Sequence, residues 1–100
     1  MVEQSINPTT IVRRTQVMMS ADLGEETVMM DIEKGHYYRL DEVGSRIWAL
    51  VERPVSIRHL CEQLVSEYEI PLERCEQEVL DFLDSLVYHD IVEIVGDAAS

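Results

Sequence analysis

The sequence predicts a mixed α and β domain in which a three-stranded antiparallel meander precedes a three-helix bundle. Residues 17–40 alternate apolar and polar side chains in three short runs separated by glycine-containing turns, which is typical of hairpin-connected strands. Residues 41–87 instead repeat apolar side chains every three or four positions, which is typical of amphipathic helices. A chain of 100 residues is near the common size of one domain, and 46% hydrophobic residues suffice for a core.

One folded domain is expected over residues 11–95, with flexible segments at 1–10 and 96–100. The first ten residues are polar and include a proline, and the chain ends in the short tail GDAAS. We expect a short extended piece to begin at Ile11 and the apolar run Ile91–Val95 to form a closing strand.

Two strands come first within the meander. The first, Val17–Asp22, has Val17, Met19 and Ala21 on one face, and the turn LGEE follows it. The second is Thr27–Ile32. Alternation along this strand directs one set of side chains toward the core, Val28, Met30 and Ile32, and the other set toward solvent, Thr27, Met29 and Asp31.

The third strand is His36–Leu40, and it follows the short hairpin loop EKG, whose glycine can take the left-handed conformation. Tyr38 and Leu40 share one face of this strand, whereas Tyr37 and Arg39 share the other. Hairpin connections place the third strand at an edge of the sheet. The strand has no proline and one charge, so its edge is poorly protected and an extended peptide can add to it as a fourth strand.

Three helices are expected after the meander. Asp41 and Ser56 are predicted N-caps of the first two, because their side-chain oxygens can accept from the amides of the first turn. Pro71 suits the first turn of the third helix, which we expect to end near Val87. Gly44 costs the first helix about 1 kcal/mol relative to alanine, which indicates close approach of another backbone or a large ring.

The third helix has two apolar stripes, whereas a single core contact needs one. The first helix has one stripe with Trp48 beside it, consisting of Val43, Ile47, Leu50 and Val51. The first stripe of the third helix consists of Leu72, Cys75, Val79, Phe82, Leu83 and Leu86. Its second stripe holds Leu80 and Val87, one heptad apart. We expect this second stripe to lie either under another layer or along a groove.

The charge of the chain excludes some classes of partner. Eight basic residues stand against twenty acidic ones, for a net charge of −12. Nucleic-acid binding depends on Lys and Arg to displace phosphate counterions, and an acidic membrane surface repels such a chain for the same reason. A basic or neutral peptide or protein is therefore the expected partner, with no nucleic acid and no membrane.

No set of residues predicts catalysis, a cofactor or a metal site, so the chain is expected not to be an enzyme. His36, His59 and His89 are scattered and have no metal-ligand spacing. Cys61 and Cys75 form no CxxC pair and fall on apolar helix faces, which predicts two reduced core thiols. The carboxylates of the third helix indicate a solvated acidic face or, as the alternative, one wall of a peptide site.

The expected localisation is cytoplasmic. No run reaches the ~18 apolar residues of a membrane span. The N-terminus has neither the basic region nor the apolar region of a signal peptide.

Three stretches together resemble the PqqD family: GHYYRLDEVGSRIWALV (35–51), SIRHLCEQLVSEYEIP (56–71) and CEQEVLDFLDSLVYHDIV (75–92). The shared features are a hairpin glycine, two aromatics, a Leu–Asp pair, Val–Gly and Ile–Trp in the first helix, and an acidic, apolar third helix. The resemblance covers about Val12 to Val95. It implies a winged-helix-like fold and a recognition element for ribosomally made, modified peptides. The precursor's leader would add as a strand along the third strand, in a cleft walled by the third helix.

The resemblance and the exposed edge together predict a peptide-binding set. Its members are Tyr37, Tyr38, Arg39 and Leu40 on the third strand and Glu76, Leu80, Leu83, Asp84 and Val87 on the third helix. Leu80, Leu83 and Val87 are spaced to line one ridge, with Leu83 also in the core stripe. Asp84 lies beside that ridge, where it can meet a basic leader residue.

The resemblance leaves the maturation enzyme open. The favoured role is the recognition protein of a split lasso-peptide system that presents the leader to a separate cysteine protease, because the chain is short and has an extended N-terminal segment. The alternative is a peptide chaperone for a radical-SAM enzyme. From the residues alone, a small dimerisation module also remains, a monomer or weak dimer paired through the third strand.

Overall fold

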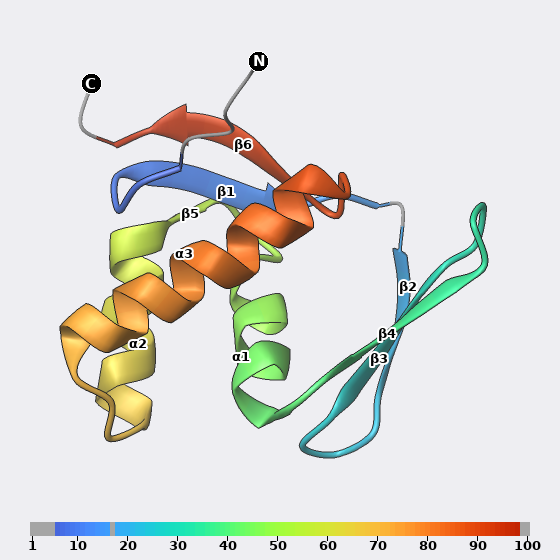
Figure 1. Ribbon diagram of the computed structural model, residues 1–100, viewed down its shortest axis with the longest axis horizontal. Coiled ribbons are helices and arrows are strands. Elements are labelled where there is room, and N and C mark those ends of the chain that lie inside the picture. The colour runs from blue at the N-terminus through green and yellow to red at the C-terminus, as the bar shows by residue number, and fades with distance from the viewer. Residues whose placement is uncertain (1–5, 17, 99–100) are drawn as a thin grey trace.

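The computed structural model describes residues 6–16 and 18–98. Within them, six strands form two small antiparallel sheets, and three helices lie beside these sheets (Figure 1). The elements are β1 (Thr10–Arg14), β2 (Met18–Asp22), β3 (Thr27–Asp31), β4 (His36–Leu40), α1 (Glu42–Leu50), β5 (Val55–Ser56), α2 (Ile57–Glu67), α3 (Leu72–Tyr88) and β6 (Val92–Asp97). The predicted mixed α and β class is confirmed, whereas the winged-helix arrangement is not.

The predicted meander is present as a sheet of order β2-β3-β4, which we call the meander sheet. The turn before β3 closes with a 2.7 Å hydrogen bond from the Leu23 amide to the Glu26 carbonyl. Gly24 and Gly35 have φ angles of 88° and 72°, so both hairpins use the left-handed conformation that favours glycine. β4 lies at an edge of the sheet, as predicted. Val17, expected in the first strand, lies outside the described residues.

The predicted orientation of β3 is wrong. Met29 is fully buried and Asp31 is 9% exposed, whereas Ile32 is 60% exposed. The side chains expected to face solvent therefore face the core. The cause lies on β4, where Leu40 points into the core directly before α1 and pairs with Thr27. Cross-strand partners share a face, so β4 imposes its orientation on β3.

The buried carboxylate of Asp31 is accommodated by the hairpin that follows it. Its Oδ1 accepts hydrogen bonds from the amides of Glu33 at 3.0 Å and Lys34 at 3.1 Å. A polar side chain with such partners can lie on the core side of a strand. Counting apolar residues on each face therefore fails to predict the orientation of this strand.

A second sheet joins the two ends of the chain. We call it the terminal sheet, and its order is β5-β1-β6. Thr10 pairs with Asp97, and the Ala98 amide donates to the Thr9 carbonyl at 2.8 Å. Pro8 accepts from the Arg58 amide at 2.7 Å. The extended piece expected from Ile11 and the closing strand expected at Ile91–Val95 are thus present as β1 and β6, whereas their pairing was not predicted.

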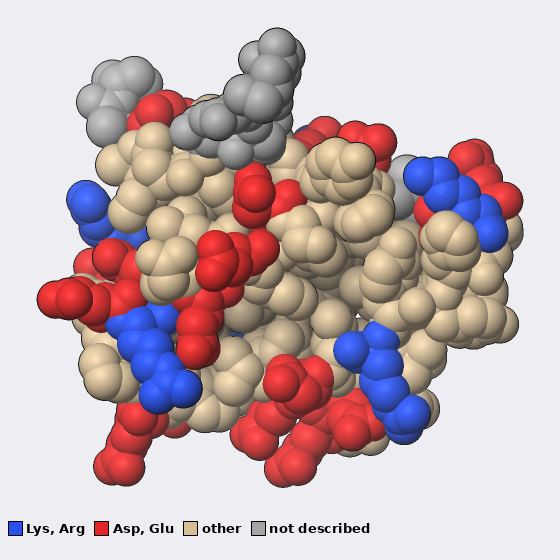
Figure 2. All heavy atoms as spheres, in the orientation of Figure 1, with Lys and Arg blue, Asp and Glu red and all other residues tan. Residues whose placement is uncertain are grey.

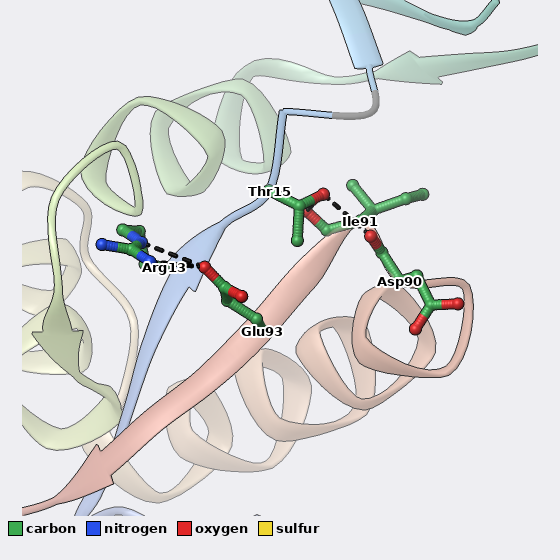
Figure 3. Close-up of polar contacts among 5 residues, drawn as sticks. All are labelled: Arg13, Thr15, Asp90, Ile91 and Glu93. Atoms are coloured by element: carbon green, nitrogen blue, oxygen red, sulfur yellow. Dashed lines mark hydrogen bonds and ion pairs between the residues drawn. The ribbon is translucent and has the colours of Figure 1, made fainter.

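The end of β1 also ties down the turn that follows α3 (Figure 3). The Thr15 amide donates to the Ile91 carbonyl at 2.8 Å, and the Thr15 hydroxyl donates to the carbonyls of Asp90 and Ile91. Arg13 and Glu93 form a 2.6 Å ion pair across the two strands. Asp90 has a left-handed φ of 62°, which ends the helix and starts the strand. These contacts anchor the C-terminal end of α3 to the terminal sheet.

The helix starts follow the predicted caps. The Gly44 amide donates to Asp41 Oδ1 at 2.8 Å, and the His59 amide donates to Ser56 Oγ at 3.1 Å. Pro71 is itself the N-cap of α3 and makes no side-chain bond, so it stands one position earlier than expected. Trp48 on α1 donates from Nε1 to Ser20 Oγ on β2 at 3.3 Å, which attaches the meander sheet to the helices.

Cys61 and Cys75 are buried free thiols, as predicted. Burial raises the pKa of Cys61 to about 12 and raises that of Cys75 as well. At neutral pH both are therefore thiols rather than nucleophilic thiolates. No helix among the described residues has the length and apolar character needed to cross a membrane.

A bidentate ion pair connects α1 with α2. Arg46 donates from Nε and Nη2 to the two carboxylate oxygens of Glu67, each at 2.8 Å, and Gln63 donates to the same carboxylate. These bonds lower the pKa of Glu67 from 4.5 to about 2. The folded state therefore binds the proton less well than the unfolded state does. The stabilisation is complete above about pH 4.5 and disappears as the pH falls toward 2.

We expect Glu67→Gln to lower the free energy of unfolding at pH 7 by at most about 1 kcal/mol, because the pair is partly exposed. The difference from the wild type should shrink between pH 4.5 and 2. Urea unfolding of both proteins across this range measures it. A difference that stays constant with pH contradicts a role for the Glu67 charge.

Candidate functional site

A cavity of about 360 Å³ lies between the end of β4 and α3. We call it the groove cavity. β4 contributes Arg39 and Leu40, and α3 contributes Glu78, Val79 and Phe82. The remaining lining residues come from the loop after β4, α1, α2, the α2–α3 connection and the start of α3: Asp41, Val43, Gly44, Ile47, Leu64, Ile70 and Cys75. Most of these side chains are apolar, so the cavity suits an apolar ligand group.

Gly44 lets α1 come close to β4 at the edge of this cavity. A Cβ atom on Gly44 would lie 3.4 Å from the Leu40 Cβ and 3.3 Å from Asp41 Oδ1. Gly44 is therefore closely approached, but by side-chain atoms of Leu40 and Asp41 rather than by the backbone or large ring that was expected. A larger side chain here would press on both and reduce the cavity.

The edge of β4 beside the cavity has no partner strand among the described residues. Tyr37 on this strand is 71% exposed, and Tyr38 is half-buried on the opposite face. The Tyr38 ring lies 6.3 Å from the His89 ring, which contacts Tyr88 edge-on at 5.1 Å. The four predicted residues of β4, Tyr37 to Leu40, are thus together, with the groove cavity at one end and an aromatic group at the other.

The structure separates the predicted α3 residues from the groove cavity. Leu83 is fully buried in the core, and Leu80 and Val87 are half-buried against it. None of the five predicted residues lines the cavity: Glu76, Leu80, Leu83, Asp84 and Val87. Two positions along a helix differ by about 200°, so Leu80 and Phe82 point to nearly opposite sides of α3.

The apolar α3 residues that line the cavity belong to the stripe that the sequence assigned to the core. Val79 is buried and Phe82 is half-buried. One feature of the sequence could have indicated these residues. The stripe is wide, because Phe82 and Leu83 are adjacent and cannot both lie on one narrow core-facing row. Which edge of the stripe faces β4 depends on how α3 packs on α1 and α2, and periodicity contains no information about that packing.

The charged groups at the mouth of the groove cavity are mostly paired. Arg39 Nε donates to Glu26 Oε1 at 3.0 Å, and Arg74 Nε donates to Glu78 Oε2 at 3.0 Å. On the face that carries α3, acidic side chains cover more of the surface than basic ones, between larger uncharged areas (Figure 2). A peptide approaching this face therefore meets a negative field, which favours a basic or neutral ligand.

The cysteine that lines the groove cavity is not activated as a nucleophile. Cys75, which lines the cavity, has a raised pKa and a hydrogen bond of 4.0 Å from its Sγ to the Cys61 carbonyl. Among residues 6–16 and 18–98, no three His, Cys, Asp or Glu side chains are placed to hold a metal ion. The arrangement is that of a binding site with an unpaired strand edge, an apolar cavity and few polar groups.

Comparison with known proteins identifies both a family and a complex. A family model described as coenzyme PQQ synthesis protein D (PqqD) matches residues 26–92. A solved structure described as TbiB1 in complex with the TbiA(beta) leader peptide is similar to this chain, with 29% sequence identity and a TM-score of 0.76. The similarity covers 85% of this chain and 99% of that chain. No curated protein matches.

Proposed function

This chain belongs to the PqqD family, and on that premise we propose that it binds the leader region of a ribosomally synthesised precursor peptide by strand addition at β4. The observation that carries the proposal is the unpaired edge of β4 next to the groove cavity. The similar chain TbiB1 was solved with a leader peptide, which supports the same class of ligand.

Strand addition explains why the cavity lies where it does. An added strand would satisfy the outward backbone groups of β4, which supplies affinity for any extended peptide. Alternate side chains of that strand would point toward α3, where Val79 and Phe82 offer an apolar wall and Leu40 an apolar floor. The cavity would then select among peptides, since burying an apolar side chain at one peptide position increases the affinity.

The proposed site differs from the predicted one on α3 only. Tyr37, Tyr38, Arg39 and Leu40 remain the strand side of the site. On the helix side, the lining residues Glu78, Val79 and Phe82 replace the predicted set. Leu80, Leu83 and Val87 are assigned to packing.

The described N-terminal residues leave this site open. Residues 7–10 contact α2 and β6 through Pro8 and Thr9, and β1 and β6 lie beside each other at the far side of α3 from β4 (Figure 1).

We further propose that the chain performs no chemistry and delivers the leader to a separate maturation enzyme. The favoured enzyme is a leader-cleaving cysteine protease of a lasso-peptide system. A radical-SAM enzyme is the second candidate, because the matching family is described by synthesis of coenzyme PQQ. A dimer paired through β4 is a further candidate that follows from the same unpaired edge, and an added peptide would compete with it.

Selection from a library of displayed random peptides against the immobilised chain tests this function. Enriched peptides are expected to bind with micromolar Kd in calorimetry, about −8 kcal/mol, with the TbiA(beta) leader peptide as a first probe. N-methylation of the peptide backbone should abolish binding at alternate residues only, because only every second amide donates to β4. Failure to enrich any peptide, or equal tolerance of N-methylation at all positions, contradicts strand addition.

Salt dependence provides a second measurement on the same peptides. The main-chain bonds and the apolar cavity should dominate, so raising salt to the physiological range should weaken binding only modestly. A loss of more than about a hundredfold, the size typical of phosphate binding, would instead indicate that charge dominates.

A further inference from the structure

The meander sheet has a second face, opposite the one that carries Leu40, and only Arg39 on it also borders the groove cavity. We call it the outer face, and its residues are Met19, Ala21, Val28, Met30, Tyr37 and Arg39. It is the more apolar face of β3, and it is turned outward because Leu40 directs the other face into the core. Met19 is 58% exposed and Tyr37 71%, so this face offers apolar surface to solvent. Neighbouring apolar side chains of this kind can take part in contact with a ligand or partner.

The outer face consists of two cross-strand rows that both end at the open edge. Register places Met19 opposite Met30 and Met30 opposite Tyr37, which forms an apolar row. The second row has Ala21 opposite Val28 and Val28 opposite Arg39. Each row ends on β4, where a peptide added as a fourth strand would contribute the next member.

We propose that the bound leader is recognised on both faces of the sheet, and that Tyr37 and Arg39 select its outward side chains. This inference rests on the proposed function and names a second specificity site within it. The side chain that joins the row ending at Tyr37 is apolar or aromatic, and the one that joins the row ending at Arg39 is acidic. The two lie two residues apart, because alternate residues of a strand share a face.

The chemistry of each row end decides its preference. A directly opposite pair on neighbouring strands has Cβ atoms about 5 Å apart, close enough for Tyr37 to cover an apolar partner. Arg39 is 72% exposed and its Nε–H bonds to Glu26. A guanidinium has five N–H donors, so a leader carboxylate can bind Arg39 while Glu26 remains in place.

The two faces therefore place different demands on one peptide. Residues of one parity face the groove cavity and its acidic surroundings, where apolar side chains fit. Residues of the other parity face Tyr37 and Arg39. A leader that fits both faces therefore has constrained residues at inward and at outward positions in alternation. A groove on one face alone would constrain only the inward positions.

The test repeats the peptide selection with Arg39→Glu in place of the wild type. Peptides enriched on the wild type should share an acidic residue at one outward position, and those enriched on the variant should carry Lys or Arg there, with the inward positions unchanged. Exchanging peptides between the two proteins should cost about two- to fivefold in Kd, the size of an exposed cross-strand charge pair. Arg39→Gln should remove the preference for an acidic residue at that position without reversing it. This variant replaces Arg39→Glu in the test if the new glutamate repels Glu26 and destabilises the hairpin.

Arg58→Glu on α2 is the matched control, since it makes the same change of charge on an exposed residue of a different element. It should leave the outward preference intact. If wild-type peptides bind with parity-dependent N-methylation but their outward positions vary freely, this inference is wrong and the proposed function stands. If no peptide is enriched at all, both are overturned.

Discussion

Replacement of Phe82 by glutamate is expected to weaken binding of the selected peptides by at least about a hundredfold, or about 2.8 kcal/mol, while the domain still folds. Phe82 lines the groove cavity from α3 and is half-buried, so its side chain contributes to the site without filling the centre of the core. A carboxylate at this position must lose its hydration when an apolar side chain enters the cavity, and no basic partner in the cavity wall other than Arg39 is available among the described lining residues. Calorimetric titration measures the loss.

Leu80→Glu is the matched control for Phe82→Glu. Leu80 is also half-buried on α3, but it points away from the groove cavity, about 200° from Phe82 around the helix. Its variant should bind peptide like the wild type. Thermal melts of both variants must show cooperative unfolding for the comparison to count. If Leu80→Glu loses binding and Phe82→Glu retains it, the ridge of Leu80, Leu83 and Val87 is the peptide site after all.

Ile47→Asp is expected to unfold the protein. Ile47 lies on α1 with 4% of its surface exposed and belongs to the core. An unpaired carboxylate buried there costs several kcal/mol or forces the backbone apart, and a domain of this size has a total stability of about 5–15 kcal/mol. Circular dichroism should show loss of the cooperative thermal transition at neutral pH.

Ile47→Val is the control that keeps the position apolar, and it should lower stability by only about 1 kcal/mol. Because Ile47 also borders the groove cavity, a folded Ile47→Asp variant with a melting temperature near the wild type would mean that this side chain reaches water through the cavity. That result would contradict the assignment of Ile47 to the core.

Local features of the fold were predictable because the residues that make them are neighbours in sequence. Asp41 caps α1 and Ser56 caps α2 through bonds to amides three residues away. Gly24 and Gly35 take positive φ angles in the two hairpin turns, a conformation that glycine adopts readily because it has no Cβ. The edge position of β4 also follows from sequence, since short hairpins leave the last strand of a meander with one neighbour.

The position and facing of the β4 residues were therefore predictable, whereas the α3 residues that line the groove cavity were not. Tyr37, Tyr38, Arg39 and Leu40 alternate faces as expected on β4. On α3, both Leu80 and Phe82 are apolar and both are half-buried. Only the packing of the helix against α1 and α2 distinguishes them, because it decides which flank lies along β4.

The sequence by itself determined approximately where the three helices and the strands of the meander lie, that β4 is an edge strand, and that the chain is acidic. The tertiary structure decided which face of β3 is buried, which flank of α3 borders the groove cavity, and that β1 pairs with β6. The reason is separation along the chain. Arg13 and Glu93 meet across 80 residues, and Leu40 orients β3 through pairing and core packing rather than through its own neighbours. Contacts of that kind leave no periodic signal in the residues that make them.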